Sequence, residues 1–554
     1  MSCTRTLLLA TALFAASSCH DNATDTAQPT PAQTLPPAFV QVPLLEPNPE
    51  PTVPLAAVLT LETDRPTQVE LGFDDGIRQW EVVIGGYSEV HERIPVLGMR
   101  PGLTHQITVV VRDEDGQATD APTTLEFTTP DLPADFPDLQ VTTTSPEEQE
   151  PGVFLVNARA LEQPAIAYVF MVDQEGEVVW YYDANQRPYT ANQFASAYRT
   201  SNGHLLVING RQSCYEMDML GNLQGAWLAN RLVTPPTPAG TVMVDTDTMH
   251  HEIRDLPPGS GADFVVISSE MRTLPNYPSS VITPWVTNLE TEVIGDLLVE
   301  FNRDGTIVRE ISLFDLLDPY RVTYDSLLGF WNPTYQASAT ADWSHGNAVY
   351  YDDRDDSYLV SLRHQDALIK IDRTTTELRW ILGDPARWEW PWSTKLLRPI
   401  GNEFEWQYHQ HGPEITPEGT ILLFDNGNGR AIPPVEALPL DGAYSRAVEY
   451  RVDEAAMTVE QVWAYGGKFD PENHFYSAFL GDARLMPQTG NVLVTDGART
   501  TSAAPVRRNG RIAEVTRTTP PRVLFEMFVL DDSPTDPHNW TVYRAVHLPS
   551  VYPD

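Results

Sequence analysis

Cysteine is nearly absent from this chain of 554 residues, which contains only Cys3, Cys19 and Cys214. Two of the three lie in the first 19 residues, so a chain processed at that point keeps a single thiol, Cys214. One thiol cannot form a disulfide within the chain, and it cannot supply a zinc site built from several cysteines. Both stabilising devices are therefore excluded for the processed protein.

Positive charge is also scarce. Lysine and arginine together number 36 against 76 aspartates and glutamates, which gives a formal net charge of −40 and a pI near 4.5. Nucleic acids and anionic membrane surfaces repel such a protein, so neither is an expected partner. A small anionic ligand is still allowed, because its site needs only local positive charge.

Long apolar runs are missing after the first residues of the chain. The start has Arg5, an apolar run over 7–16 and small residues up to Cys19. That run is too short to span a bilayer and is typical of a signal peptide. Small residues directly before Cys19 resemble a bacterial lipobox, so we expect an exported protein, periplasmic or at the cell surface, that meets the membrane only through a lipid on Cys19. The alternative is an ordinary secretory signal with an incidental cysteine.

Two segments precede the main part of the chain. Residues 20–50 are rich in Pro, Thr, Gln and Ala, which predicts a disordered tether. Between 51 and 129, short alternating strands are separated by turn signals such as Asp74-Asp75-Gly76. This spacing predicts a small β-sandwich, interpreted as a spacer or docking module. Its strands are expected at 56–60, 67–73, 80–84, 105–112 and 123–128.

A hairpin pattern then recurs six times beyond a proline-rich joint at 130–138. Between successive hairpins lies a second unit, a strand, a turn such as P-x-G and an apolar strand. Four strands per repeat, six times, predict an all-β, six-bladed β-propeller over 139–554. The hairpins are expected at 167–182, 214–228, 297–312, 367–382, 447–465 and 511–528.

The two ends of this region predict how the ring closes. Residues 543–549 match an innermost strand with no partners after it, whereas 153–157 and the first hairpin lack an innermost strand. One blade built from both parts would remove the free edges of the sheet. Tryptophan-rich insertions are expected to roof one face, and they cover 272–295, 315–342, 383–410 and 426–446.

Three histidines fall in register at the starts of inner strands, which ring the channel of a propeller: His251, His345 and His411. Arg363 follows the antiparallel strand 358–362 and so returns to the same mouth. Asn347 lies two residues after His345, on the same side by the period of a strand. The pattern predicts a cluster of three histidines, an arginine and an asparagine.

Each member of the cluster has an alternative reading. His250 could take the place of His251, and Arg363 could simply pair with a carboxylate such as Asp366. The glycine-rich run 425–429 is interpreted as a loop. Four other histidines of this region fall outside the register and are interpreted as structural: His364, His409, His474 and His547.

Three function classes fit such a cluster. An enzyme could use one imidazole as nucleophile and others as acid and base. A metal-dependent hydrolase could hold Zn²⁺ on the three imidazoles, although the cationic Arg363 opposes a dication. A propeller without catalysis could display this face to a partner.

Three stretches carry a resemblance to a known family: 342–373 (DWSHGN…SLRHQ), QHGPEI at 410–415 with FDNGNGR at 424–430, and HHEI at 250–253. They resemble bacterial arylsulfotransferases, exported enzymes that move sulfuryl groups between phenols without a nucleotide donor. The resemblance implies a ping-pong reaction of small aryl sulfates and phenols, without cofactor or metal. It implies His411 as the histidine that becomes sulfated, with His251, His345, Asn347 and Arg363 as the other active-site residues. Members of the family carry a disulfide, which this processed chain cannot form. A homodimer is compatible with the sequence.

Overall fold

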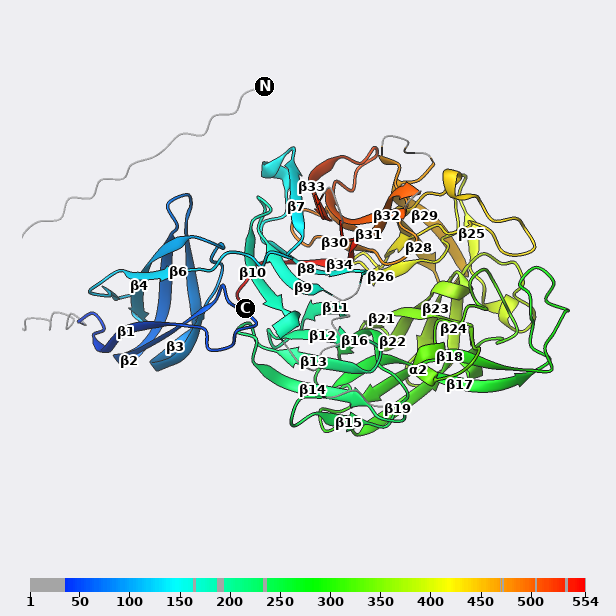
Figure 1. The fold of residues 1–554 in the computed structure, drawn as a ribbon, viewed down its shortest axis with the longest axis horizontal. Coiled ribbons are helices and arrows are strands. Elements are labelled where there is room, and N and C mark those ends of the chain that lie inside the picture. Colours follow the sequence, from blue (N-terminus) through cyan, green and yellow to red (C-terminus); the bar gives the residue numbers. More distant parts are fainter. Residues whose placement is uncertain are drawn as a thin grey trace, which may run out of the picture.

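The computed structural model describes residues 35–162, 166–186, 194–232, 237–468, 470, 473–503, 506–533 and 537–553. Their strands form one sheet in an N-terminal domain and six further sheets of four or five strands each (Figure 1). The all-β class and the six blades predicted from the hairpin pattern are thus confirmed. No helix in the described part of the chain combines the length and apolar character that crossing a bilayer requires.

The N-terminal domain is organised around one bent strand, β2. Its first half pairs with β1 and its second half with β4, and it pairs with β3 throughout. Irregular pairing between Glu62 and Thr67 lets the strand bend and change neighbours, so the sheet folds around its own core. Two strands predicted separately are therefore one. The strands are β1 (Phe39–Pro47), β2 (Ala57–Asp74), β3 (Gln79–Val96), β4 (Thr104–Asp113), β5 (Ala118–Asp120) and β6 (Leu125–Thr128).

Strand β1 corrects the prediction of a disordered tether over 20–50. Residues 39–47 pair with β2, and Phe39 and Leu45 pack against the core of the domain. Main-chain hydrogen bonds to an existing strand edge order this segment in spite of its proline-rich composition. Residues 1–34, with the predicted signal peptide and Cys19, lie outside the described residues.

Six blades surround a central channel, and the inner strand of each packs against the inner strands of both neighbours, which closes the ring. The strands of each blade are given from the inner strand outward. The first blade has β34 (Trp540–Leu548), β8 (Val153–Ala160), β9 (Ala167–Val172) and β10 (Val178–Asp183), and the second has β11 (Phe194–Arg199), β12 (Leu205–Asn209), β13 (Ser213–Met217), β14 (Leu223–Ala229) and β15 (Val242–Val244). The third has β16 (His250–Asp255), β17 (Phe264–Pro275), β18 (Glu290–Phe301) and β19 (Ile307–Ser312), with β20 (Ala341–Asp342) beside β18, and the fourth has β21 (Gly346–Asp352), β22 (Ser357–Leu362), β23 (Ala367–Asp372) and β24 (Leu378–Gly383). The fifth has β26 (His411–Ile415), β27 (Ile421–Asp425), β28 (Arg446–Asp453), β29 (Thr458–Gly466) and β25 (Arg398–Ile400), and the sixth has β30 (Asp482–Leu485), β31 (Val492–Ala503), β32 (Val506–Val515), β33 (Val523–Leu530) and β7 (Asp138–Thr143). Short helices are α1 (Leu313–Leu316) and α2 (Asn332–Tyr335).

The ring closes at two places. Strand β34 pairs antiparallel with β8, as predicted, with Trp540 opposite Ala160 and Leu548 opposite Val153. Strand β7, which directly follows the proline-rich joint, pairs with β33 as the outermost strand of the last blade. This second closure was not predicted, because the joint masked a short strand.

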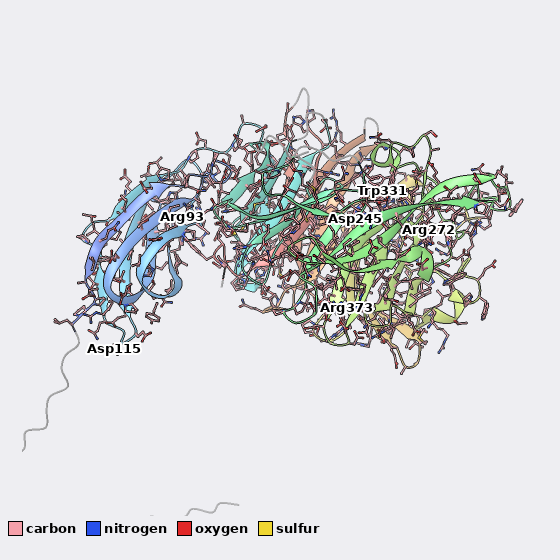
Figure 2. The ribbon with its side chains drawn as sticks, turned by 90° about the horizontal axis from the view of Figure 1, so that it is seen from below. Arg93, Asp115, Asp245, Arg272, Trp331 and Arg373 are labelled. Carbon is pink, nitrogen blue, oxygen red and sulfur yellow. The ribbon has the colours of Figure 1, made fainter. Side chains whose placement is uncertain are left out.

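The N-terminal domain packs on the first blade, at one side of the propeller in both views (Figures 1 and 2). Asp173 at the end of the β9 hairpin accepts hydrogen bonds from Arg78 (2.7 Å) and Arg100 (3.4 Å). The Leu97 N–H donates to Tyr552 Oη at 2.8 Å, and Leu97 joins a core cluster with Val551 of the propeller. Apolar burial and ion pairs therefore fix the domain in place.

Candidate active site

A cavity of about 520 Å³ opens at the mouth of the channel. Four of the five residues predicted for the cluster line it: His251, His345, Arg363 and His411. Tyr543, at the corresponding position of the closing strand, lines it as well. The register argument thus places four of the five residues in one cavity, as the structure shows.

Local irregularities in three inner strands turn these histidines toward the cavity. The pairing register shifts after His250, after Gly346 and after His411. His251 and His345 have left-handed φ values of 58° and 47°, and after His411 the same role falls to Gly412 with φ 55°. A bulge re-aims side chains at the cost of backbone strain, a combination that is typical of functional sites.

His411 has a fixed tautomer. Its Nδ1 lies 2.6 Å from Oδ1 of Asn426, whose Nδ2 donates to the carbonyls of Ser477 and Leu480, both at 2.8 Å. Those two bonds orient the amide, so its oxygen faces the imidazole and Nδ1 carries the proton. Nε2 is left with its lone pair. Burial and then the charge of Arg363 hold the pKa of His411 well below its usual range, which keeps the ring neutral.

His345 is held by a buried carboxylate. Its Nδ1 lies 2.5 Å from Oδ2 of Asp342, whose Oδ1 accepts a 3.0 Å hydrogen bond from the indole of Trp331. The Nδ1 proton therefore faces Asp342. The pKa of His345 lies well below its usual range because of burial, followed by the charges of Arg363 and Arg211.

His250 and His251 both line the cavity, although the sequence suggested that only one of them would. Their Nδ1 atoms are 2.6 Å apart, which requires that one of them donates to the other. His250 packs edge-on against Trp331, labelled in Figure 2, with ring centroids 4.8 Å apart. Burial, and then the charge of His345, lower the pKa of His250 to about 3. His251 lies 5.1 Å from the ring of His345.

Arg363 points into the cavity and does not pair with Asp366. Its guanidinium lies 2.5 Å from His364 Nε2 and 3.6 Å from Asp325. Asp366 instead accepts from the main-chain N–H of His409 and contacts its Nδ1, both at 2.8 Å. Arg363 therefore pairs with a carboxylate, Asp325 rather than Asp366, and it lines the cavity as well.

The position of His364 also differs from the prediction, which made it a structural residue outside the site. It lines the cavity, and its ring lies 4.5 Å from that of His345. His409 lies behind it, with Nε2 3.3 Å from Asp325. His474 and His547 line no part of this cavity.

Asn347 does not line the cavity, contrary to the prediction. Its side chain is fully buried, and its Nδ2 donates to the carbonyl of Gln410 at 2.8 Å. The register shift between Gly346 and Ala348 interrupts the strict alternation on which the prediction depended. Asn347 thus fixes the main chain directly before His411.

Sequence reasoning missed several residues of this site. Asn426 was read as part of a glycine-rich loop, and Asp342, Asp325 and Phe330 come from the insertion 315–342. The prediction that the insertions roof one face is confirmed only in part. Asp325, Leu328 and Phe330 of the insertion 315–342 line the cavity. Trp285 and Trp390, which lie on other insertions, are 76% and 79% exposed. The D-x-x-H spacing of Asp342 and His345 was the available signal.

Buried ion pairs join three of the inner strands next to the histidines. Arg544 donates to Glu252 at 2.5 and 3.1 Å and lies 3.6 Å from Asp482. Glu252, Asp482 and Arg544 directly follow His251, Gly481 and Tyr543, which occupy matching positions of three inner strands. The ion pairs therefore form a layer one residue further along the inner strands than the histidines.

Two groups among the described residues could offer metal ligands within 4.8 Å of one another: Asp325, His364 and His409, and Asp342, His345 and His364. Neither is the trio of His251, His345 and His411 that the metal alternative invoked. The guanidinium of Arg363 contacts His364, which belongs to both groups, and its charge opposes a dication there.

Comparisons with known proteins identify the family of this chain. A family model described as arylsulfotransferase (ASST) matches residues 138–544, and one described as an arylsulfotransferase Ig-like domain matches 44–130. An arylsulfate sulfotransferase AssT of Escherichia coli is 28% identical over 428 residues, or 68% of this chain and 65% of that protein. One from Lelliottia amnigena is 27% identical over 438 residues, or 70% of this chain and 66% of that protein. The matches thus span slightly less than two thirds of each relative.

A solved structure of a periplasmic gluconolactonase from Pseudomonas aeruginosa, 14% identical, covers 71% of this chain and 99% of its own with a TM-score of 0.30. A score this low supports no inference, so the six-bladed assignment depends on the sheet topology alone. The family is established by the match over most of the chain: the protein belongs to the arylsulfotransferase family.

Proposed function

We propose that this protein is an arylsulfate sulfotransferase that moves a sulfuryl group from an aryl sulfate to a phenol through a sulfated His411. The observation that carries the proposal is the fixed tautomer of His411, whose Nδ1 proton is held by Asn426. A neutral imidazole with a bare Nε2, beside a guanidinium in the same cavity, has the chemistry of a nucleophile for an anionic ester.

In the first half-reaction, His411 Nε2 attacks the sulfur in line with the aryl oxygen. The S–O bond to the aryl group breaks as the S–N bond forms, and the phenolate leaves. Arg363 holds the sulfuryl oxygens as negative charge shifts toward the leaving oxygen. In the second half-reaction the oxygen of a phenol attacks the same sulfur, the S–N bond breaks and His411 returns to its neutral form.

Protons pass through His345 or His251. Because Asp342 holds Nδ1 of His345, its Nε2 is the nitrogen that takes the proton of the incoming phenol, and Asp342 stabilises the imidazolium that results. The same imidazolium can protonate the next leaving phenolate. Bound substrate favours the charged ring, since a nearby anion raises the pKa of an imidazole. Asn347 acts as a positioning residue through Gln410.

The proposal is tested by incubating the purified protein with 4-nitrophenyl sulfate, with and without phenol. With donor alone we expect a burst of about one nitrophenol per protein, followed by slow release. Phenol should restore continuous release and appear as phenyl sulfate. No release under either condition would favour a propeller without catalysis.

Exhaustive chelation should leave the activity intact, because the steps above require only imidazole and guanidinium groups. The measurement is transfer from 4-nitrophenyl sulfate to phenol after dialysis against EDTA, with metal content determined on the same sample. Activity that disappears on dialysis and returns with stoichiometric Zn²⁺ would establish the metal-dependent alternative.

The pH profile of sulfuryl uptake should lack an acidic limb near 6.5. His411 must be neutral to attack, and its pKa is lowered, so the reactive form persists as the pH falls through 6.5 and is lost only below the lowered pKa. We expect uptake measured in single-turnover experiments to stay level from pH 8 to below 6. Since Arg363 contributes to the lowered pKa, the limb of Arg363→Gln should move upward. An unperturbed limb at 6.5 in the wild type would contradict the assignment.

We further propose an exported protein anchored by a lipid on Cys19. The support is the leader pattern of a basic residue, a short apolar run and small residues before the cysteine. Labelling with a radioactive fatty acid in a bacterial host, compared with Cys19→Ser, tests the anchor.

A further inference from the structure

The cavity has a second cationic end that the proposed reaction does not use. Arg363 and His411 come from the blades of β22 and β26, whereas Arg159 and Arg211 come from the blades of β8 and β12. In a closed ring of six blades, the blade of β8 lies opposite that of β22. Three arginines thus line one cavity in a protein whose net charge is −40.

Arg159 has no partner for its charge. Its side chain is half-buried in the cavity wall, and no hydrogen bond or ion pair joins its guanidinium to any residue within the described ranges. The next two residues, Ala160 and Leu161, also line the cavity and are apolar. A half-buried guanidinium without an anion is unfavourable, because desolvation of a charge is costly unless the charge is paired.

Arg211 is held rigidly beside the cavity. Its Nη1 donates to the carbonyl of Phe330 at 3.0 Å and to Thr334 Oγ1 at 2.9 Å, and its guanidinium lies 3.9 Å from the centre of the Phe330 ring. Its Nε and Nη2 donate to none of the residues the structure describes. These contacts hold the guanidinium in one orientation and leave donors free for a ligand.

The neighbouring carboxylates do not neutralise this end. Asp342 is engaged by His345 and Trp331, and Asp325 by His409 and Arg363. Burial lowers the pKa of Arg211; the charge of Asp342 opposes that effect, and the charge of Arg159 adds to it. The two guanidiniums are therefore close enough to destabilise each other in the absence of an anion.

We propose that Arg159 and Arg211 form a second anion subsite, which binds a carboxylate or sulfonate carried by the aromatic substrate. The wall also includes apolar and aromatic side chains, Leu328, Phe330 and Phe479, which suits a ring. Phe330 contacts the guanidinium of Arg211, and its ring centroid lies 4.9 Å from that of His345. The substrates that fit are phenols and aryl sulfates with an anionic group remote from the reacting oxygen. This inference rests on the proposed function for the identity of the reacting group only.

The test compares two acceptors of the same shape, 4-hydroxyphenylacetate and 4-hydroxyphenylacetamide, with 4-nitrophenyl sulfate as donor. The wild type should favour the carboxylate in kcat/KM by about tenfold or more, the range of a charge-assisted hydrogen bond. Arg159→Met should lose this preference, and Arg159→Lys should keep part of it. The exposed Arg398 of β25, changed to Met, is the matched control and should behave as the wild type.

Calorimetric binding of the two acceptors, without donor, separates this inference from the proposed function. The carboxylate should bind wild type more tightly than the amide by a similar factor, and Arg159→Met should bind both alike, with its melting temperature unchanged. This result would support the subsite even if no transfer were detected. Equal binding of both acceptors by the wild type, or a preference that survives in Arg159→Met, would overturn it.

Discussion

His411→Ala should gain no sulfuryl group and transfer none. With donor alone, the wild-type protein should increase in mass by one sulfuryl group, roughly 80 Da, in a form that acid removes, as expected for a nitrogen-linked sulfate. The variant should lose both the mass gain and transfer, because covalent catalysis needs a nucleophile and the proposal gives His251 and His345 the role of proton carriers. Intact-protein mass spectrometry and phenol release measure the two effects.

Two comparisons sharpen this experiment. His474 is exposed and lies outside the cavity, so His474→Ala should retain the label and the activity. His251→Ala and His345→Ala should slow turnover by the ~10²–10⁴-fold typical of lost acid–base catalysis, yet still accumulate label. A label that maps to His251, His345 or a tyrosine, or substantial transfer by His411→Ala, would show that the roles are wrong even though the family is right.

The ring of histidines could be predicted because it depends on a regular feature. Inner strands of a propeller all begin at one mouth, so a count from the P-x-G turns placed His251, His345 and His411 together. Asn347 was misplaced for the opposite reason: a bulge turns its side chain from the cavity to Gln410. Bulges break the period of two, and sequence alternation does not reveal them.

The partners of the histidines lie beyond such reasoning. Asn426 and Asp342 come from segments between regular strands, whose paths depend on tertiary packing. Elements of the fold that depend on tertiary packing were likewise not predicted. The repeated hairpins predicted the blades and the closure by β34, whereas β1 and β7 are short strands within proline-rich sequence that form only because a strand edge is available to pair with.

Deleting the chain from Trp540 onward should prevent folding of the propeller. The deletion removes β34, and with it Trp540, Val542 and Ala545, all buried to within 1%. Burial of a large apolar side chain contributes about 1.5–3 kcal/mol. The edge of β8 becomes exposed, and Glu252 loses Arg544 while it keeps Arg254 as a partner at 2.5 Å. The lost burial and the open edge together are of the order of the about 5–15 kcal/mol by which a typical domain is stable.

The measurement is thermal unfolding by near-ultraviolet circular dichroism, which reports the packed aromatic side chains of the blades. The truncated chain should show no cooperative transition. A synthetic peptide of residues 540–553 added in trans should restore part of the signal, because a free strand edge accepts a matching strand, whereas a scrambled peptide should not. A truncated chain that melts cooperatively at the wild-type temperature would mean that the ring does not depend on β34, and that the contacts between the other inner strands suffice to hold five complete blades and an open edge.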